Sequence, residues 1–554
     1  MSGDRGRLPG AEGRLLRGYG PVLAMIAAFA LMVTLVPTVA REQTVVHDGT
    51  AAAGSVSTIA PGTGAVVPGA PGSAPVTTGP AGGGTSTTRG IVAGHTSGCT
   101  DRVQQVPGDP YSPPCVLFGG DNGGATTRGV TRDSVTVALR LTADPDLSST
   151  IAKLAGSDVI DTTDDAARTA QGLVDYFNSR FQLYGRKLKL VPYQGRGALT
   201  RELLGAGQEQ ANADGIRVAN EIGAFADATG LTEPYADALA RQHVMAFGAP
   251  YMSRQWFVDR RPYAWSTFTD CSLLAENGAD WLGKRILGKP AAYAGGSLQG
   301  RQRKLGIVVP DNPEYQQCLQ DGLKIGHAAG YDATPISYSL DLTNLSNQAA
   351  SIVAKLKAAE ITSVAVFSDP ILPVYLTAKA HEQGYYPEWL VQGTAFTDTD
   401  VAGQLYDQTE WQHAFGISSL GPQLPERAGL GYNAYRAVRA DEPAHSVELI
   451  YYQLYMIAMG IQLAGPALTP ASFERGMFSY AGGTGEAGTW GFGPGHYTPT
   501  KDYKEVWWDG TRASPYNNRQ GTYSTNGTRF RLGRVPAGDP PCSGERPPRR
   551  GHSR

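Results

Sequence analysis

The sequence contains few cysteines and few histidines, and neither charge is in excess. Its 554 residues include five cysteines and nine histidines, and 48 Lys and Arg residues balance 50 Asp and Glu residues, for a net charge of −2. So few cysteines exclude a disulfide-dense mini-domain. The balanced charge argues against nucleic acid as a partner, because nucleic-acid-binding domains carry a strongly basic surface.

The short motifs of common enzymes are also absent. The sequence has no Gly-x-Ser-x-Gly elbow, no His-Glu-x-x-His motif and no Walker loop. It has no Cys-x-x-Cys pair, and no Cys/His spacing suits zinc. We therefore expect no catalysis, no cofactor and no metal. An enzyme stays open as an alternative, because some hydrolases share doubly wound sheets.

An uncharged apolar stretch near the N-terminus predicts export. Residues 18–40 carry no charge and follow residues 1–17, which contain four arginines. About 20 apolar residues suffice to span a bilayer, and the arginines place the N-terminus in the cytoplasm. We favour an uncleaved single-pass anchor over a signal peptide cleaved after Ala40. Either interpretation puts the rest of the chain outside the cytoplasm, membrane-tethered or secreted.

Two segments have the composition of disordered chain. Residues 41–96 are rich in Gly, Ala, Pro, Ser and Thr, and such a sequence cannot bury enough apolar surface to offset its ordering entropy. We expect a tether with a reach of about 40 Å, although a post-signal region without a role is the plainer alternative. We also expect residues 512–554 to be disordered. The Arg-, Gly- and Ala-rich composition is typical of GC-rich, actinobacteria-like genomes.

Export also permits disulfides. Cys99 and Cys115 flank a Pro-rich stretch within residues 97–128, and a bond between them would order this irregular segment. Cys271 and Cys318 are the next candidate pair, which leaves Cys542 unpaired. Five cysteines allow several connectivities, so this pairing is a preference.

Strand and helix patterns alternate from Val135 to Asp509. A strand pattern at 135–142 precedes a helical one at 166–181, and the rhythm restarts after Asp270 with a helix at 273–282 and a strand at 304–309. Such alternation predicts parallel sheets covered by helices, here in two α/β lobes. The apolar stretch 447–463 is expected to be a buried core helix rather than a second membrane span.

The loops that follow the predicted strands are rich in hydroxyl, carboxylate and Tyr side chains. In open parallel sheets, ligands bind at loops beyond the carboxyl ends of the strands. The composition therefore predicts a small polar ligand between the lobes. The plainer alternative is that these residues only form turns and helix caps. The loops are residues 143–144, 227–230, 249–253, 311–315, 368–370 and 394–398.

Five segments, in order, resemble type I periplasmic binding proteins of the Leu/Ile/Val-binding kind. The resemblance covers about residues 129–509, and no single segment is diagnostic. The segments are Gly129–Val137, Tyr176–Arg180 followed by Tyr184–Val191, Asp311-Asn312-Pro313-Glu314-Tyr315, Ala354-Lys355-Leu356-Lys357-Ala358-Ala359 and Ala380-His381-Glu382-Gln383-Gly384-Tyr385.

The resemblance implies two lobes joined by three crossovers that close like a hinge on a small ligand. Lobe I would comprise residues 129–268 and 416–490, and lobe II residues 269–415 and 491–511. Such a protein hands its ligand, an amino acid or related compound, to an ABC-type permease and is expected to be a monomer. An envelope-tethered sensor or scaffold that contacts a membrane or cell-wall partner is the alternative.

The resemblance also implies site residues. Thr229, with Asp227 and Gly230 in its loop, would hold a ligand carboxylate, and charge-assisted hydrogen bonds suit that task. Tyr315 would stack on the ligand from lobe II. The loop sequences at Asp227 and at Tyr251 depart from the family pattern, which predicts a reshaped pocket. The other residues implied to bind the ligand are Tyr251, Ser253, Asp369, Thr397 and Asp398.

Overall fold

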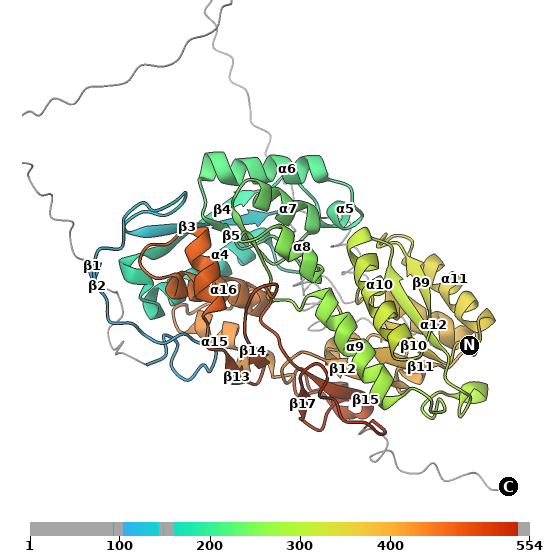
Figure 1. The fold of residues 1–554 in the computed structure, drawn as a ribbon. Coiled ribbons are helices and arrows are strands. Elements are labelled where there is room, and N and C mark those ends of the chain that lie inside the picture. Colours follow the sequence, from blue (N-terminus) through green and yellow to red (C-terminus); the bar gives the residue numbers. More distant parts are fainter. Residues whose placement is uncertain (1–91, 94–102, 143, 145–147, 149–159, 541–554) are drawn as a thin grey trace, which may run out of the picture. The chain divides into compact units, whose positions relative to one another are not determined.

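The computed structural model describes residues 92–93, 103–142, 144, 148 and 160–540 (Figure 1). The expected N-terminal segment, the anchor or signal helix, nearly all of the expected tether and residues 541–554 lie outside the described residues. Most of the described residues fold around two large separate sheets, and helices pack on each of them.

The first sheet is parallel and has the strand order β4-β3-β5-β6-β7. Its interior strand β3 is nearly continuously apolar from Val135 to Leu139 and is buried there, as expected for a strand covered on both faces. We refer to this sheet and its helices as lobe I. Its strands are β3 (Ser134–Leu141), β4 (Lys187–Gln194), β5 (Ala226–Asp227), β6 (Met245–Phe247) and β7 (Ala264–Trp265).

The helices of lobe I come from two separate stretches of chain. Thr162 and Asp165 form a capping box that starts α4, because the two side chains satisfy backbone N–H groups that the first helical turn leaves free. Phe177 of α4 packs against Tyr451 and Tyr455 of α16, with ring centroids 5.3 and 5.9 Å apart. The helices are α4 (Thr163–Arg180), α5 (Leu199–Leu203), α6 (Gln208–Arg217), α7 (Glu233–Arg241), α8 (Arg254–Asp259), α15 (Leu430–Arg436), α16 (Val447–Ala464) and α17 (Pro470–Phe478).

Helix α16 is the helix among the described residues whose length and composition would suit a membrane span. However, 72% of its apolar window is buried inside the structure. Its aromatic side chains Tyr451 and Tyr455 lie in the main core cluster. The expectation of a core helix at residues 447–463 is therefore confirmed.

The second sheet joins parallel and antiparallel strands in the order β9-β8-β10-β11-β12-β15-β16, with β17 paired to β15. We refer to this sheet and its helices as lobe II. Helices α10 (Pro313–Ala328) and α11 (Leu345–Ala358) lie on opposite sides of its strands (Figure 1). Helix α9 (Cys271–Arg285) packs beside α10, and α12 (Leu372–Glu382) packs beside α11. The strands are β8 (Leu305–Pro310), β9 (Ala333–Tyr338), β10 (Ser363–Val366), β11 (Glu388–Val391), β12 (Ala414–Ser418), β15 (Tyr503–Ala513), β16 (Gln520–Ser524) and β17 (Arg529–Phe530).

The helices of lobe II and several shorter elements complete the described chain. A β13–β14 hairpin lies between α17 and β15, and β1 pairs with β2 ahead of lobe I. The remaining elements are β1 (Val92–Ala93), β2 (Gly119–Gly120), β13 (Gly483–Gly485), β14 (Gly488–Trp490), α9 (Cys271–Arg285), α10 (Pro313–Ala328), α11 (Leu345–Ala358), α12 (Leu372–Glu382), α13 (Asp400–Gly403) and α14 (Gln408–Trp411).

The expectation that the chain is disordered from residue 512 is wrong as far as residue 540. Strand β16 pairs with β15, and Tyr523 packs on Trp508 with ring centroids 5.1 Å apart. The backbone N–H of Tyr523 and the hydroxyl of Thr522 both donate to Asp400, at 2.7 and 2.8 Å. These partners lie far away in sequence, so composition alone could not reveal them.

The chain passes three times between the two lobes: from β7 to α9, from β12 to α15 and from β14 to β15. Strand β12 ends at Ser418 and belongs to the second sheet. The expected return to lobe I at residue 416 therefore falls inside a lobe II strand.

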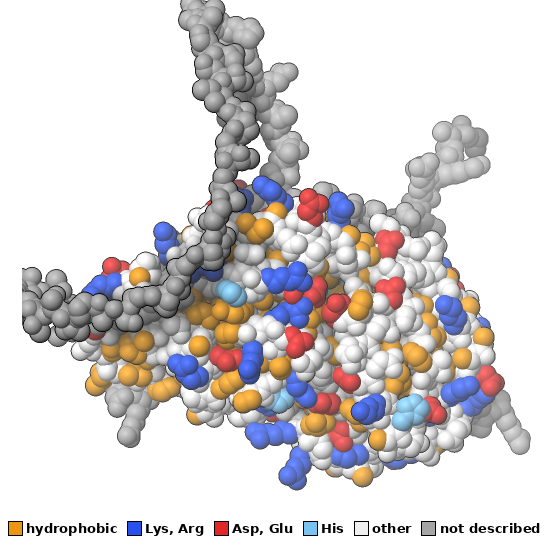
Figure 2. Space-filling view, turned by 45° about the horizontal axis from the view of Figure 1, so that its top comes forward, with side chains coloured by type: hydrophobic (Ala, Val, Ile, Leu, Met, Phe, Trp, Pro, Cys, Tyr) orange, Lys and Arg blue, Asp and Glu red, His pale blue; other side chains and the backbone are white. Residues whose placement is uncertain are grey.

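On the face drawn in Figure 2, acidic and basic side chains are intermixed rather than gathered by sign.

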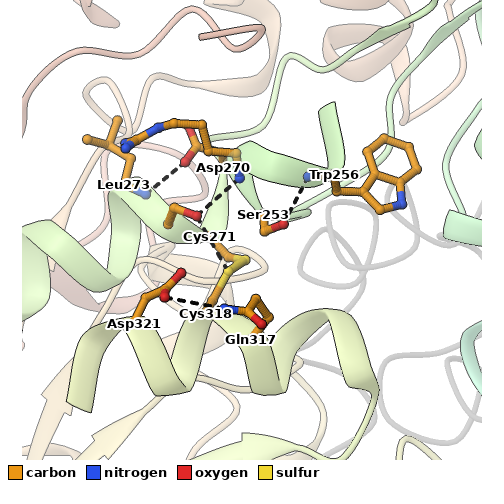
Figure 3. Close-up of a disulfide and its surroundings, with 10 residues drawn as sticks. Ser253, Trp256, Asp270, Cys271, Leu273, Gln317, Cys318 and Asp321 are labelled. Carbon is orange, nitrogen blue, oxygen red and sulfur yellow. Dashed lines mark hydrogen bonds between the residues drawn. A yellow bond between two sulfur atoms is a disulfide. The ribbon is translucent and has the colours of Figure 1, made fainter. Parts of the chain in front are cut away.

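A disulfide joins Cys271 to Cys318, with Cα atoms 5.8 Å apart (Figure 3). This bond confirms one of the two expected pairs. It links the first turn of α9, just after the first crossing, to α10, and Ser253 of lobe I lies beside it (Figure 3). Cys115 is also disulfide-bonded, and its expected partner Cys99 lies outside the described residues.

Candidate functional site

The loops at the carboxyl ends of the two sheets contact one another. The side-chain amide of Asn312, after β8, donates to the backbone oxygen of Leu203 at 2.7 Å. Phe268, which follows β7, packs edge-on against Phe396, which follows β11, with ring centroids 5.8 Å apart. Loops of lobe I and lobe II therefore meet where sequence analysis expects a ligand.

Tyr251 of lobe I reaches the loop that follows β11. Its phenol interacts with the backbone at Ala395 and Phe396, and its ring lies 5.7 Å from that of Phe268. Burial raises the pKa of Tyr251 well above its usual range, and the nearby Asp398 carboxyl raises that pKa further. Tyr251 thus stays a neutral hydroxyl at the meeting point of the two lobes.

Asp398 is a buried carboxyl with one oxygen left without a partner. Its Oδ2 accepts a hydrogen bond from the Ser418 hydroxyl, whereas its Oδ1 has no hydrogen-bond partner among the described residues. The hydroxyl of Thr394 nearby in the same loop is also buried and unpartnered there. Burial raises the pKa of Asp398 to about 6, and the Ser418 hydrogen bond limits the rise. Unsatisfied buried polar atoms are uncommon and call for an explanation.

The backbone at this meeting point is strained. Tyr251, Ala395 and Phe396 have φ angles of 56°, 47° and 63°, in the left-handed region that residues with a Cβ rarely adopt. Each such residue costs about 1–3 kcal/mol, and such strain gathers at binding sites and switch regions. The three residues lie on both sides of the contact between the lobes, so the strain is concentrated there.

Tyr315 and Asp369 of lobe II approach the same region. Burial raises the pKa of Tyr315, and Asp369 is among the neighbouring carboxylates that raise it further. Asp369 itself accepts from the Tyr338 hydroxyl at 2.6 Å and from the backbone N–H of Leu372 at 2.9 Å, so it caps the start of α12. Burial raises the pKa of Asp369 as well. Its oxygens already serve the fold.

The Asp227–Gly230 loop satisfies its own polar groups. The buried Asp227 carboxylate accepts from the Thr229 hydroxyl and from the Tyr235 hydroxyl, both at 2.7 Å. The Thr229 hydroxyl in turn accepts from the backbone N–H of Arg140 at 2.8 Å. Gly230 donates its N–H to Phe247 of β6 at 2.9 Å. Burial raises the pKa of Asp227 to about 6, and its hydrogen bonds limit the rise.

Ser253 and Thr397 also have structural partners. The Ser253 hydroxyl caps α8 by accepting from the backbone N–H of Trp256 at 3.1 Å (Figure 3). The Thr397 hydroxyl donates to the backbone oxygen of Thr394 at 2.7 Å. Both side chains shape the loops from which Tyr251 and Asp398 project.

The structure thus brings together three of the nine expected site residues: Tyr251, Tyr315 and Asp398. Sequence analysis missed three further residues beside them: Phe268, Thr394 and Phe396. We call these six residues the interlobe cluster. A signal existed in each case, because Thr394 and Phe396 belong to a loop that follows a strand and Phe268 lies at the first crossing. Among the described residues, no group of three or more His, Cys, Asp or Glu side chains could hold a metal ion.

Comparisons with known proteins connect this arrangement to a fold. No protein-family model matches the sequence, and no curated protein matches it. Solved structures do match. A substrate-binding protein of an ABC transporter from Aeropyrum pernix aligns with 72% of this chain and 96% of its own, at a TM-score of 0.51 and 15% identity.

A second similar structure is a solute-binding protein of an ABC transporter from Rhodopseudomonas palustris BisB5, in complex with 3,4-dihydroxybenzoic acid. It aligns with 72% of this chain and 98% of its own, at a TM-score of 0.50 and 12% identity. Another R. palustris solute-binding protein, in complex with 4-hydroxybenzoate, has the same coverage and TM-score at 11% identity. The two-lobed architecture described here is therefore the type I periplasmic-binding-protein fold.

Proposed function

We propose that this chain is an exported solute-binding protein that holds a small molecule at the interlobe cluster and presents it to an ABC-type importer. One observation carries the proposal: the Oδ1 of Asp398 is buried without a partner among the described residues, and its carboxyl lies near Tyr251 of the other lobe. A hydrogen-bond acceptor in such surroundings gains most from a ligand that donates to it. No catalytic step is proposed.

The cluster favours a compact ligand with a donor group and a flat or apolar body. Asp398 and Thr394 offer acceptor oxygens, and Tyr251, Phe268 and Phe396 offer aromatic surface. A ring hydroxyl or an amine would meet Asp398 well, and the R. palustris proteins named above carry ring-hydroxylated acids. An amino acid would place its amino group at Asp398. Its carboxylate would need donors other than Thr229, because that hydroxyl is engaged with Asp227.

Access to the cluster requires the lobes to separate. Tyr251 and Asp398 are 6% and 2% exposed, so solvent barely reaches them. Phe268 of lobe I packs against Phe396 of lobe II beside them, and within the described part of the chain three crossings join the lobes. Hinge opening about these crossings would admit a ligand, and closure would bury it. We propose that the protein acts as a monomer on the extracytoplasmic side.

A scaffold function stays as the second candidate, and a specific observation favours it. Eight of the nine expected ligand residues make hydrogen bonds within their own lobe. An aromatic contact also joins the lobes directly. A protein that never opens would use its outer surface to contact a membrane or cell-wall partner.

Ligand binding separates the two candidates. We would record the melting temperature of the purified full-length protein with hydroxybenzoates, aromatic amines, amino acids, small peptides, amides and sugars. A ligand at about 100 times its Kd adds about 2.7 kcal/mol of stability, which raises the melting temperature by a few degrees. A rise confined to one chemical class supports solute binding. No rise with any class would favour the scaffold.

The same assay tests Asp398. Replacing Asp398 with Asn should weaken binding of the best ligand about tenfold to 100-fold, since a buried hydrogen bond to a charged group contributes about 1.5–3 kcal/mol. For a ligand with an amine, affinity should fall as the pH drops through about 6, because Asp398 then takes up a proton and loses its charge. The control is Asp332→Asn, whose side chain is 81% exposed. Equal affinities in both variants would contradict the assignment.

A further inference from the structure

A second hollow lies beside the crossings between the lobes. It is open to solvent and has a volume of about 780 Å³, which is within the range of small-molecule sites. Its walls come from the start of α8, the first turns of α9, the β13–β14 region and the segment that leads to β15. None of its lining residues belongs to the interlobe cluster, so it is a separate site.

Positive charge predominates in this cavity. Arg254, Lys501, His496 and Arg531 line it, together with a single acid, Glu276. Both terminal nitrogens of the Arg254 guanidinium donate to Glu276, at 2.9 and 2.8 Å, so the one negative charge is already paired. The Nε of Arg254 is buried and has no hydrogen-bond partner among the described residues.

Lys501 provides the uncompensated charge. Among the described residues no acid forms an ion pair with its ammonium group, whereas three other lysines have such a partner. Burial lowers the pKa of Lys501 to about 8, with Arg254 lowering it further and Asp270 raising it. Burial lowers the pKa of His496 to about 4, and its neighbours Lys501 and Arg254 contribute to that shift. Burial is the main cause of both shifts and the neighbouring cations add to them, so an anion placed beside Lys501 would favour its charged form.

The cavity also has an apolar wall. Trp490, Leu273 and Leu532 line it beside the charged groups, and Leu532 is 44% exposed. A bare inorganic ion would leave this wall in contact with water. A molecule with an anionic group and an apolar body would cover the wall while it pairs with Lys501, because apolar burial and charge pairing then add.

We propose that this cavity is a second binding site that takes a small organic anion, whose carboxylate or phosphate group pairs with Lys501 and the free Nε of Arg254. Its apolar part would lie on Trp490 and Leu273. Arg254 belongs to α8 of lobe I, whereas Leu273 belongs to α9, directly after the first crossing. The bound anion would therefore contact both sides of that crossing. This inference does not depend on what the interlobe cluster binds.

Titration calorimetry on the full-length protein tests the site. The probes are benzoate, phenyl phosphate, inorganic phosphate and the uncharged analogue benzamide. We expect benzoate or phenyl phosphate to bind, inorganic phosphate to bind more weakly, and benzamide not to bind. Lys501→Gln should weaken binding at least tenfold, whereas Lys501→Arg, which keeps the charge, should retain it. Lys324→Gln, at an exposed lysine of α10, is the matched control.

Two further results decide the assignment. Because the anion favours charged Lys501, binding at pH 8 should take up about half a proton, measured by comparing buffers of different ionisation heat. The charged groups around Lys501 are Arg254, Arg531, Glu276 and Asp270, with the neutral imidazole of His496 beside them, and the uptake should vanish in Lys501→Arg. Binding that survives Lys501→Gln but disappears in Asp398→Asn would place the anion at the interlobe cluster and overturn the proposal. Equal affinity for benzoate and benzamide would also overturn it.

Discussion

Replacing Arg140 with Met should lower the free energy of unfolding by about 3–5 kcal/mol, because it leaves buried carboxylates without their counter-charge. The Arg140 guanidinium donates to Glu202 at 3.1 Å and to Asp214 at 2.9 Å. All three side chains are at most 4% exposed. Asp214 and Glu202 cannot reach water without rearranging the loop that encloses them.

The loop around Arg140 has a sequence suited to this enclosure. Gly195 and Gly197 pass directly over the guanidinium, and a Cβ added at Gly197 would lie only 1.8 Å from an Arg140 nitrogen. The backbone N–H of Arg196 also donates to Asp214, at 2.9 Å. The ion pairs therefore hold β3, α5 and α6 together, and Asp214 adds the loop after β4 through its backbone. Their loss should loosen the whole carboxyl edge of lobe I.

Urea-induced unfolding of the full-length protein measures this effect. The control is Arg301→Met, which removes an ion pair with Glu360 whose side chains are 46% and 66% exposed. An exposed pair of this kind contributes about 0–1 kcal/mol. A triple variant that combines Arg140→Met with Glu202→Gln and Asp214→Asn should recover part of the loss, because it removes the unpaired charges. If Arg140→Met and Arg301→Met were equally stable, the ion-pair network would not support lobe I.

The architecture was predictable wherever apolar residues follow one another closely along the chain. The run from Val135 to Leu139 identifies β3, and strand β8 begins and ends within one residue of the expected range 304–309. Short strands were harder to predict. Residues 218–222 form a single π-helical turn, and the strand that follows, β5, is only Ala226–Asp227. A short apolar run does not distinguish a strand from a buried turn.

The site was less predictable, because its chemistry depends on partners distant in sequence. Thr229 and Asp227 have the residue types of a ligand loop, yet Thr229 is engaged by the backbone of Arg140, 89 residues away. The free oxygen of Asp398 emerges only once Ser418 is seen to take the other one. One useful signal was in the sequence: Arg140 interrupts a buried apolar strand, and a buried charge demands partners.

Removing the disulfide with Cys271→Ala and Cys318→Ala together should lower the free energy of unfolding by about 2–4 kcal/mol. The two cysteines are 47 residues apart, so the bond closes a long loop and restricts the unfolded chain. Alanine avoids leaving buried hydroxyls without partners. Urea-induced unfolding measures the loss, and Cys542→Ala is the control, since sequence analysis pairs Cys542 with no other cysteine.

The position of the disulfide predicts how a reductant should act. Both cysteines are fully buried, so a thiol reagent has to wait for the structure to open before it attacks. Dithiothreitol should therefore leave the native protein oxidised, and it should lower the urea midpoint of the wild-type chain toward that of the double variant only under unfolding conditions. The N–H of Cys271 also donates to the Met252 oxygen of lobe I at 3.0 Å. This hydrogen bond ties the disulfide to the loop of lobe I that contains Tyr251. The disulfide therefore stabilises the start of lobe II, directly after the first crossing, where that loop contacts it. Rapid reduction of the native protein would show instead that this crossing opens without global unfolding.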